Sequence, residues 1–423
     1  MTIAVLFGSF AIFLLLTIPI GIALGLSTLI TILYSSSVPI DFLARELITS
    51  LDSFPLLAVP FFILAGEVMG KGGISKRIFA FANSLVGNKT GGFAIATIIT
   101  CMFFAAISGS GPATVAAIGS VMIPAMVSNG YDKRFAAAVV AAAGSIGVII
   151  PPSIPMIMFG VTGSTSIGDL FIAGIIPGIM VGLAMMVWAY IYSRKKGYQG
   201  IDEPTSIKKI GKTLWDAKWA MMMPVIILGG IYSGLFTPTE SAVIAVVFGL
   251  IVSLFVYKEL SIKDLPKVFC DSALTTGIVL IIVGTATAFG RFLTIEQIPN
   301  KIAQAMISVS ESPVIIMMMI AIFLLIVGCF MDTTAAIIIL TPILLPVALQ
   351  IGYDPIHFGI IMVVNLAIGF ITPPLGVNLF VASGITGYSV GVLSKAVLPF
   401  LVAMLLTLIL LILVPQISLI LVN

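Results

Sequence analysis

Charged residues are scarce in this sequence: they make up 9% of its 423 positions, whereas 60% are hydrophobic. A soluble domain carries about a quarter charged residues, so this composition excludes a soluble fold. The net charge is only +3 and the basic residues lie in short connections, which excludes a nucleic-acid-binding surface. Apolar runs long enough to cross a hydrocarbon core of about 30 Å recur throughout. We therefore expect an all-α protein that spans the lipid bilayer many times.

Histidine and cysteine are also rare. The single histidine, His357, excludes a His-based triad or a conventional metal site, and no paired carboxylates suggest a membrane-embedded enzyme. The cysteines Cys101, Cys270 and Cys329 lie in apolar segments, and we expect them to pack in the core rather than form disulfides. The segment from Met1 to about Tyr34 lacks a basic start and a clear cleavage site. It is predicted to be a first membrane span rather than a removed signal peptide.

An internal repeat becomes visible when the chain is shifted by 222 residues. The repeated residues are helix breakers within apolar stretches, and no gap is needed to align them. Paired, interrupted helices in two halves of a membrane chain indicate the binding site of a transporter. The matching positions are Pro124 and Pro346, Gly130-Tyr131-Asp132 and Gly352-Tyr353-Asp354, Gly147 and Gly369, Pro151-Pro152 and Pro373-Pro374, and Pro177 and Pro399.

Two apolar stretches, 91–129 and 313–350, are each interrupted by a short polar break. The first break is Ser108-Gly109-Ser110-Gly111-Pro112 and the second is Asp332-Thr333-Thr334. Irregular backbone at membrane depth is tolerated only where it is buried in protein or lines a cavity. We therefore expect two helical hairpins that re-enter the membrane, each from one side. Two further segments, 133–163 and 355–388, are predicted to be broken helices.

The remaining segments are predicted to form a scaffold around this core. Continuous spans are expected at 2–34, 54–70, 166–193, 216–236, 238–257, 269–291 and 392–421. Shorter segments that mix apolar and charged residues, at 39–50, 74–87 and 296–309, are expected to lie along the membrane interface as arms. The predicted organisation is scaffold and arms (1–90), first core repeat (91–165), scaffold with a cytoplasmic loop at 194–215 (166–312), second core repeat (313–390) and a last scaffold helix (391–423).

The basic residues predict the orientation of the chain. Lysine and arginine cluster between residues 194 and 218 and again between 258 and 267, so both connections are placed in the cytoplasm. The first hairpin is then expected to enter from the cytoplasm and the second from outside. Five predicted spans separate the hairpins, and this odd number inverts the second repeat relative to the first.

The four breaks provide the candidate ligands. Unwound carbonyls next to serine, threonine and asparagine oxygens suit Na⁺, while the N-termini of half-helices suit an anion. We expect two or more Na⁺ sites flanking one substrate site. The predicted Na⁺ ligands are Ser108, Ser110, Gly111, Thr114, Ser145, Gly147 and Pro151 in the first repeat, and Asp332, Thr333, Thr334, Gly369 and Thr372 in the second. The predicted substrate-binding residues are Pro152, Ser153, Asn365, Pro374, Gly376 and Asn378.

Simpler roles are open for several of these residues. The Ser-Gly-Ser-Gly-Pro break is also typical of a tight turn, and small residues often serve close helix packing. Because no Lys-Ser or Lys-Thr follows it, a nucleotide-binding loop is not expected. Asp332 can cap the helix that begins at Thr333, a role compatible with binding a cation.

Three other charged residues have open roles. Glu67 is either part of a structural pair near a helix end or a transport residue. Arg291 can meet an acidic substrate, although extension to the membrane interface is the simpler interpretation. Glu240 follows Thr237-Pro238, the pattern of a capping box with proline at the first helical position.

Five motifs resemble the large membrane subunit of the tripartite ATP-independent periplasmic (TRAP) transporters, and the likeness extends over nearly the whole chain. The resemblance implies a Na⁺-driven elevator in a bacterial inner membrane, with a mobile core of two hairpins and two broken helices. The motifs are Leu64-Ala65-Gly66-Glu67, Ser108-Gly109-Ser110-Gly111, Ile149-Ile150-Pro151-Pro152-Ser153-Ile154-Pro155, Thr237-Pro238-Thr239-Glu240 and Thr372-Pro373-Pro374-Leu375-Gly376-Val377-Asn378.

The resemblance also implies partners and a substrate class. A small four-helix membrane subunit, expected here as a separate polypeptide, and a periplasmic substrate-binding protein complete the transporter. The substrates of the family are organic acids, among them C4-dicarboxylates, sialic acids, sugar acids and keto acids. The alternatives are a self-sufficient Na⁺/dicarboxylate symporter that needs no binding protein, and a passive channel subunit.

Overall fold

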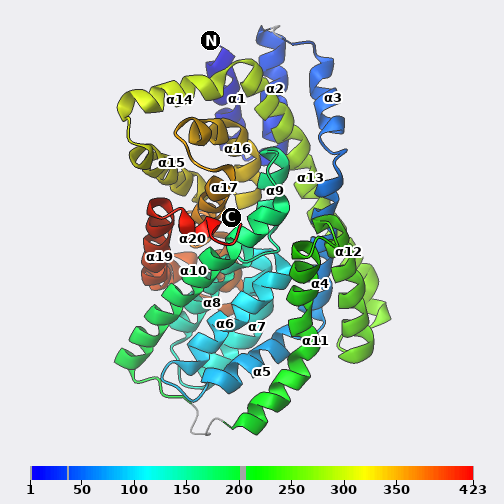
Figure 1. Cartoon of the computed structure of the whole chain (residues 1–423), viewed down its shortest axis with the longest axis vertical. Helices are drawn as coiled ribbons and strands as arrows, with labels where there is room; N and C mark the ends of the chain where they lie inside the picture. The colour runs from blue at the N-terminus through cyan, green and yellow to red at the C-terminus, as the bar shows by residue number, and fades with distance from the viewer. Residues whose placement is uncertain (1, 36–37, 201–205, 423) are drawn as a thin grey trace.

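The computed structural model describes residues 2–35, 38–200 and 206–422, and all regular secondary structure in these ranges is helical (Figure 1). Eight of the described helical segments, between 18 and 34 residues long, are long and apolar enough to cross a membrane. The expectation of an all-α polytopic membrane protein is confirmed.

The helices of the two repeats match at the 222-residue shift found in the sequence. Gly130 and Gly352, which follow the second helix of each hairpin, both have a left-handed backbone, with φ of 81° and 84°. The first repeat contains α6 (Gly92–Ser108), α7 (Gly111–Ser128), α8 (Lys133–Gly144), η2 (Ser145–Val148), α9 (Ile154–Thr162) and α10 (Ile167–Lys196). The second contains α15 (Pro313–Gly328), α16 (Thr333–Gln350), α17 (Pro355–Gly369), α18 (Val377–Thr386) and α19 (Val390–Leu413).

All four predicted breaks are present. Helices α6 and α7 form one hairpin and α15 and α16 the other, and Figure 1 shows them toward opposite ends of the long axis. The broken helices are α8–α9, interrupted between residues 144 and 154, and α17–α18, interrupted between 369 and 377. Each interruption contains a cis proline, in the pairs Pro151-Pro152 and Pro373-Pro374. That the hairpins re-enter a membrane stays a prediction.

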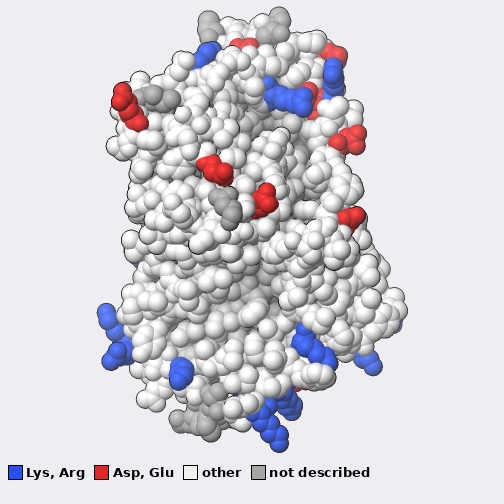
Figure 2. Space-filling view, in the orientation of Figure 1, with Lys and Arg blue, Asp and Glu red and all other residues white. Residues whose placement is uncertain are grey.

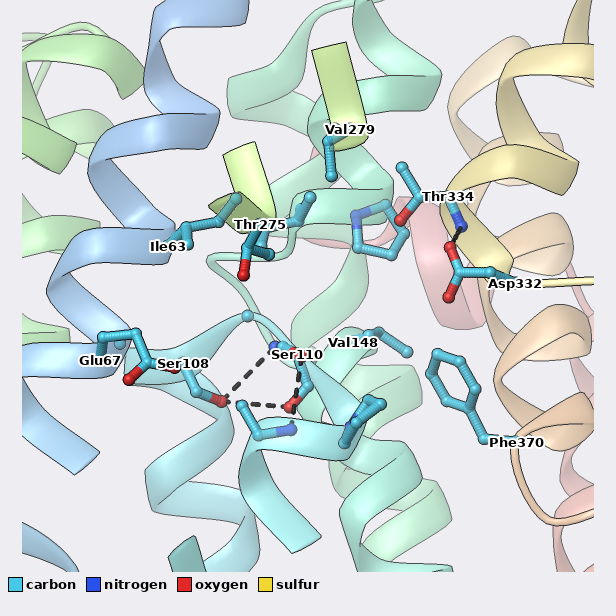
Figure 3. Close-up of a pocket in the computed structure, with 16 residues that line it drawn as sticks. Ile63, Glu67, Ser108, Ser110, Val148, Thr275, Val279, Asp332, Thr334 and Phe370 are labelled. Atoms are coloured by element: carbon cyan, nitrogen blue, oxygen red, sulfur yellow. Dashed lines mark hydrogen bonds between the residues drawn. The ribbon is translucent and has the colours of Figure 1, made fainter. Parts of the chain in front are cut away.

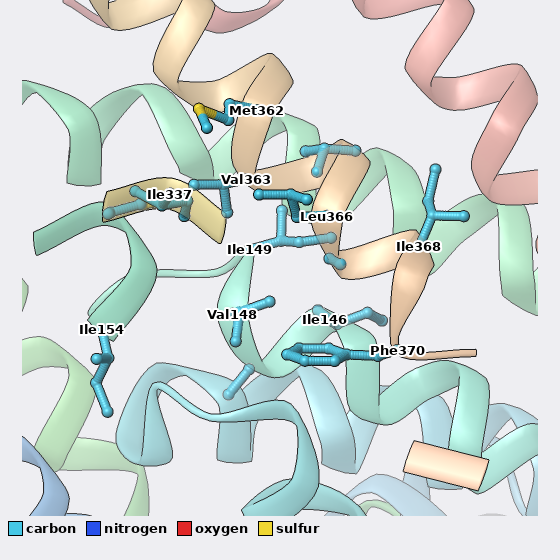
Figure 4. Packing of buried hydrophobic residues seen from close by; sticks show 14 of the residues in the cluster. Ile146, Val148, Ile149, Ile154, Ile337, Met362, Val363, Leu366, Ile368 and Phe370 are labelled. Atoms are coloured by element: carbon cyan, nitrogen blue, oxygen red, sulfur yellow. The ribbon is translucent and has the colours of Figure 1, made fainter. Parts of the chain in front are cut away.

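The two broken helices pack against each other in the middle of the molecule (Figure 4). Apolar side chains of the first break meet those of α17 and its end, and all are nearly inaccessible to solvent. Because lipid tails are as apolar as these side chains, close packing rather than exclusion of water stabilises such a contact within a membrane. The buried residues at this contact include Ile146, Val148, Ile149, Val363, Leu366 and Phe370.

The other helices surround this core. Helices α5 and α14 cross the long axis near its two ends, as expected of arms, whereas α3 runs along the side of the molecule (Figure 1). These elements are α1 (Thr2–Leu15), α2 (Ile20–Ser35), α3 (Asp41–Thr49), η1 (Phe54–Leu57), α4 (Ala58–Lys71), α5 (Ile74–Val86), α11 (Ile207–Tyr232), α12 (Pro238–Ile251), the π-helical turn η3 (Val252–Val256), η4 (Ile262–Asp264), α13 (Leu265–Ile295), α14 (Ile298–Val309) and α20 (Gln416–Leu419).

The prediction of one membrane span at 2–34 was wrong. This segment forms two helices, α1 and α2, which pack against each other as a hairpin. The turn between them contains Thr17 in the left-handed conformation, with φ of 60°, and Pro19. Proline disfavours a helical conformation in the residue before it, so the helix ends ahead of Pro19.

Two smaller expectations also need correction. Cys270 is exposed on α13 instead of packing in the core, while Cys101 is buried as expected. The polar connection predicted at 194–215 is shorter, because α10 continues to Lys196 and α11 already begins at Ile207. Residues 201–205 of this connection lie outside the described residues.

Candidate functional site

A cavity of about 200 Å³ lies where the two hairpin tips meet helices α4 and α13 (Figure 3). Four of the predicted Na⁺ ligands line it: Ser108 and Ser110 from the first tip, and Asp332 and Thr334 from the second. Residues 222 positions apart in two halves of the chain thus face one space. The opposite wall comes from Ile63 and Glu67 of α4 and from Thr275 and Val279 of α13.

The first tip is a tight cluster of oxygen atoms. The Thr114 hydroxyl donates to the Ser110 carbonyl at 2.8 Å and lies 2.9 Å from the Ser108 hydroxyl. Gly147 of the broken helix packs directly on this cluster, since a β-carbon built there would lie 2.6 Å from the Ser110 carbonyl oxygen and 2.7 Å from Thr114 Oγ1. The structure therefore brings together four predicted ligands of the first Na⁺ site.

The side chain of Asn378, in the second repeat, forms hydrogen bonds with residues of the first repeat. Its Nδ2 donates to the Ala141 carbonyl at 3.0 Å and to the Ser145 hydroxyl at 3.2 Å, and its Oδ1 lies 3.3 Å from a β-carbon built on Gly111. The side chain is fully buried and Oδ1 has no hydrogen-bond partner. An unsatisfied buried acceptor costs about 1–3 kcal/mol, so this oxygen is suited to a cation. Asn378, predicted to bind substrate, thus lies with Ser145 and Gly111 of the first Na⁺ set.

At the second tip, Asp332 caps α16. One carboxylate oxygen accepts a hydrogen bond from the Thr334 backbone at 2.9 Å, which confirms the capping role. The side chain is exposed to the cavity, and no lysine or arginine of the described chain forms an ion pair with it. Asp332 therefore presents an uncompensated negative charge to the space between the tips.

The other residues of the second set lie behind this tip, where the ends of α15 and α17 meet. The Thr333 hydroxyl donates to the Leu366 carbonyl at 3.5 Å, and a β-carbon on Gly369 would collide with the Gly328 carbonyl. Thr372 donates to the carbonyl of Ile368, one turn earlier, at 2.8 Å.

Asn365 is the second buried amide. Its Nδ2 donates to the Ala321 carbonyl at 2.9 Å, which joins α17 to α15. Its Oδ1 is buried without a partner, as in Asn378. Neither amide lines the cavity; each has a buried acceptor oxygen at the packing surface of a hairpin.

The remaining predicted residues support the breaks and do not line the cavity. Ser153 is buried; its hydroxyl donates to the Val148 carbonyl at 2.6 Å and accepts from the Met156 backbone at 3.3 Å. Gly376 begins α18 with a left-handed φ of 49°. The other members of this group are Pro151, Pro152 and Pro374.

Glu67 forms a structural pair near the end of α4 and also lines the cavity, while a role in transport stays a prediction. It lies 3.2 Å from Lys71 of the same helix, and Lys71 also binds Asp271 of α13 at 2.8 Å. This cluster links α4 to α13 while Glu67 faces the cavity. Thr275 lines the cavity too but was not predicted. Its hydroxyl donates to the Asp271 carbonyl at 3.0 Å, as threonines in many apolar helices do, so the sequence contained no distinguishing signal.

Arg291 and Glu240 lie away from the cavity. Arg291 forms an ion pair with Glu46 of α3, with two N–O contacts of 3.1 Å, and its side chain is 64% exposed; its extension to the membrane interface stays a prediction. The sequence did not indicate this ion pair, because its two residues lie 245 positions apart. The capping box of Glu240 with Thr237 is confirmed, with contacts of 2.8 Å and 3.2 Å.

The chain matches the family model described as "Tripartite ATP-independent periplasmic transporter, DctM component" over residues 7–417. The isethionate TRAP transporter permease protein DctMQ of Oleidesulfovibrio alaskensis is 54% identical over 98% of this chain, which spans 65% of that relative's length. The C4-dicarboxylate TRAP transporter large permease protein DctM of Pseudomonas aeruginosa is 45% identical, covering 95% of this chain and 94% of that protein.

A solved structure shares the fold. The crystal structure of the Alcanivorax borkumensis YdaH transporter superposes with a TM-score of 0.64 over 88% of this chain and 87% of that one, at 14% sequence identity.

The sialic acid TRAP transporter permease protein SiaT of Haemophilus influenzae is 40% identical over 95% of this chain and 65% of its own length. The family match over nearly all 423 residues, together with these identities, shows that the chain belongs to the DctM family, the large membrane subunit of the TRAP transporters.

Proposed function

We propose that this subunit carries out Na⁺-coupled uptake of a small organic anion that a periplasmic binding protein delivers. The observation that supports this most is the charge of the cavity. Two carboxylates, those of Glu67 and Asp332, line it, and among the described residues no lysine or arginine does. Lys71 pairs with Glu67 from outside the cavity, which leaves Asp332 as the charge that an incoming anion meets.

An anionic substrate can bind in this negatively charged cavity only if a cation binds with it. Two like charges about 4 Å apart repel by about 4 kcal/mol at an effective dielectric constant of about 20, which is about a thousandfold in affinity. A Na⁺ ion bound between Asp332 and the substrate turns this repulsion into attraction. The coupling is reciprocal, since the anion then raises the affinity for Na⁺ by the same factor.

The protein's own dipoles complete the anion site. Helices α7 and α16 both begin at the cavity, and Ser110, Pro112, Ala113 and Thr334 from their first turns line it. The N-terminus of a helix carries a partial positive charge and free N–H groups that favour an anion. Both hairpins are thus proposed to contact the substrate through helix ends, with Na⁺ ions ordering the tips behind them.

The size of the cavity favours a short substrate. Pockets for drug-sized ligands enclose about 300–1,000 Å³, whereas this cavity encloses about 200 Å³. The relative that is 54% identical is named for isethionate and one at 45% identity for C4-dicarboxylates. We therefore place small sulfonates and C4-dicarboxylates ahead of sialic acid, for which more distant relatives are named.

The partners and location are proposed from the family. The chain would work in a bacterial inner membrane with a small four-helix TRAP subunit and a periplasmic binding protein. The self-sufficient symporter is not favoured, because the relatives above are named as TRAP permeases. An elevator movement, in which both hairpins slide past α4 and α13 with the bound ions, is part of the proposal.

A disulfide between α13 and α16 tests this movement. A β-carbon built on Gly290 lies 3.3 Å from Cβ of Pro342, close to the 3.5–4.5 Å found in disulfides. In a background without the three native cysteines, Gly290→Cys with Pro342→Cys is expected to cross-link on oxidation and to slow uptake at least about tenfold. Reduction with dithiothreitol should restore the rate.

The single variants Gly290→Cys and Pro342→Cys, oxidised in the same way, are the controls and should transport at one rate with or without reductant. Cross-linking is quantified on the same samples by mass spectrometry. Full-rate uptake by fully cross-linked protein would show that α16 does not slide along α13, and the elevator proposal would be wrong.

A further inference from the structure

A second cleft, distinct from the transport cavity, lies where arm helix α5, the first half of α11 and the connection after α12 meet. It encloses about 600 Å³. It belongs to the end of the molecule at which lysine and arginine gather, the lower end in Figure 2. The side chains that define it are Lys76, Arg77, Trp215, Lys218, Trp219 and Glu259.

The cleft is held in place by specific contacts. The hydroxyl of Tyr257, which follows the π-helical turn η3, accepts from the Ala220 backbone and donates to the Asp216 carbonyl, both at 3.2 Å. The Arg77 guanidinium lies over the Tyr257 ring, 3.8 Å from its centroid. Glu259 accepts from Arg77 at 2.9 Å and from Lys76 at 3.3 Å. Three separate elements are therefore joined around one opening.

The ionisation of Glu259 preserves this arrangement at neutral pH. Partial burial disfavours its charge, but the hydrogen bonds from Arg77 and Lys76 outweigh the burial and hold the pKa of the carboxyl below its ordinary value. The carboxylate is thus charged under physiological conditions.

Positive charge remains available in the cleft. Lys76 shares Glu259 with Arg77, and its side chain is 61% exposed. The Lys218 ammonium lies 3.3 Å from the Trp215 ring centroid and 5.3 Å from that of Trp219, and forms no ion pair with any acid of the described chain. Three cations face two acids, Glu259 and Asp216. An anion bound by Lys76 and Lys218 would complete the site.

The position of the tryptophans indicates which anion. Trp215 is 69% exposed and lies at the point where the basic start of α11 gives way to its apolar part. Tryptophan is enriched at the level of lipid headgroups, and basic pockets between helices on the cytoplasmic side suit anionic headgroups. We propose that this cleft binds the phosphate headgroup of an anionic phospholipid, with Lys76 and Lys218 on the phosphate and Trp215 beside the glycerol backbone.

Tryptophan fluorescence provides a direct test, because two of the three tryptophans of the chain line the cleft. The full chain with Trp188→Phe, purified in a neutral detergent, is titrated with short-chain phosphatidylglycerol. We expect a saturable change in emission. Lys76→Gln with Lys218→Gln should raise the half-saturating concentration at least about tenfold, since both basic residues attract the anionic headgroup.

Two matched variants separate the site from general charge effects. Lys208→Gln removes an exposed cation of the same helix outside the cleft and should leave half-saturation within about twofold. Lys218→Arg keeps the charge and should retain binding. If the double glutamine variant binds phosphatidylglycerol like the parent, the site is refuted.

The ligand source is distinguished by two further titrations. Phosphatidylcholine should give no saturable change at the concentrations where phosphatidylglycerol saturates; equal half-saturation would refute recognition of an anionic headgroup. Inorganic phosphate should neither saturate the signal nor compete at millimolar concentration. Saturation by phosphate alone would assign the cleft to a soluble anion and overturn the lipid proposal.

Discussion

Replacing Asp332 with asparagine is expected to lower Na⁺-dependent uptake at least about a hundredfold while the protein stays folded. Asparagine caps a helix about as well as aspartate, so the contact with the Thr334 backbone and the start of α16 are kept. Only the charge is lost. A carboxylate about 4 Å from a cation contributes about 4 kcal/mol at an effective dielectric constant of about 20, more than the roughly 2.7 kcal/mol that corresponds to a hundredfold change in rate.

The measurement is initial uptake at several Na⁺ concentrations, with thermal unfolding of the same preparation. Glu311→Gln removes an exposed carboxylate just before α15. This control should change neither the Na⁺-dependent uptake nor the thermal unfolding. If the Asp332→Asn variant takes up substrate at the wild-type rate and with unchanged Na⁺ affinity, Asp332 serves only as a helix cap.

Gly147→Ala is expected to have a comparable effect through geometry alone. The added β-carbon would lie 2.6 Å from the Ser110 carbonyl oxygen and 2.7 Å from Thr114 Oγ1, closer than atoms can approach. Because Gly147 and Thr114 are buried and well packed, the tip of the first hairpin must shift. We expect half-saturating Na⁺ to rise at least about tenfold and uptake to fall accordingly.

Gly229→Ala is the matched control. Gly229 lies within α11, and a β-carbon there meets no atom within 4 Å. The substitution should leave Na⁺ affinity unchanged and stabilise the helix by about 0.5–1 kcal/mol. If Gly147→Ala retains wild-type Na⁺ affinity, the oxygen cluster at the first tip is not a Na⁺ site.

The core architecture could be predicted because its signals are local. Glycine and proline recur after 222 residues at both broken helices, and a short polar break within an apolar stretch marks the tip of each hairpin. The bounds of α7 and α16 differ by that same shift. The hairpin of α1 and α2 was missed because its turn, at Thr17 to Pro19, lies within a long, mostly apolar segment and contains no glycine or charge.

The site could be predicted only in part, because some of its contacts join distant segments. The four predicted Na⁺ ligands that line the cavity, Ser108, Ser110, Asp332 and Thr334, lie at the breaks themselves. The position of Asn378 next to Ser145, 233 residues earlier, depends on how the two repeats pack. Spacing of four residues indicates the Glu67–Lys71 pair, but nothing in the sequence marks Asp271 as its third member.

The most direct test of the central claim is uptake into proteoliposomes that contain this chain and the proposed small TRAP subunit, with the proposed periplasmic binding protein outside. Radiolabelled isethionate or succinate is supplied with an inward Na⁺ gradient, without the gradient, and without the binding protein. The proposed mechanism predicts accumulation only when both the gradient and the binding protein are present. Equal uptake without the Na⁺ gradient would contradict Na⁺ coupling, and equal uptake without the binding protein would identify a self-sufficient carrier.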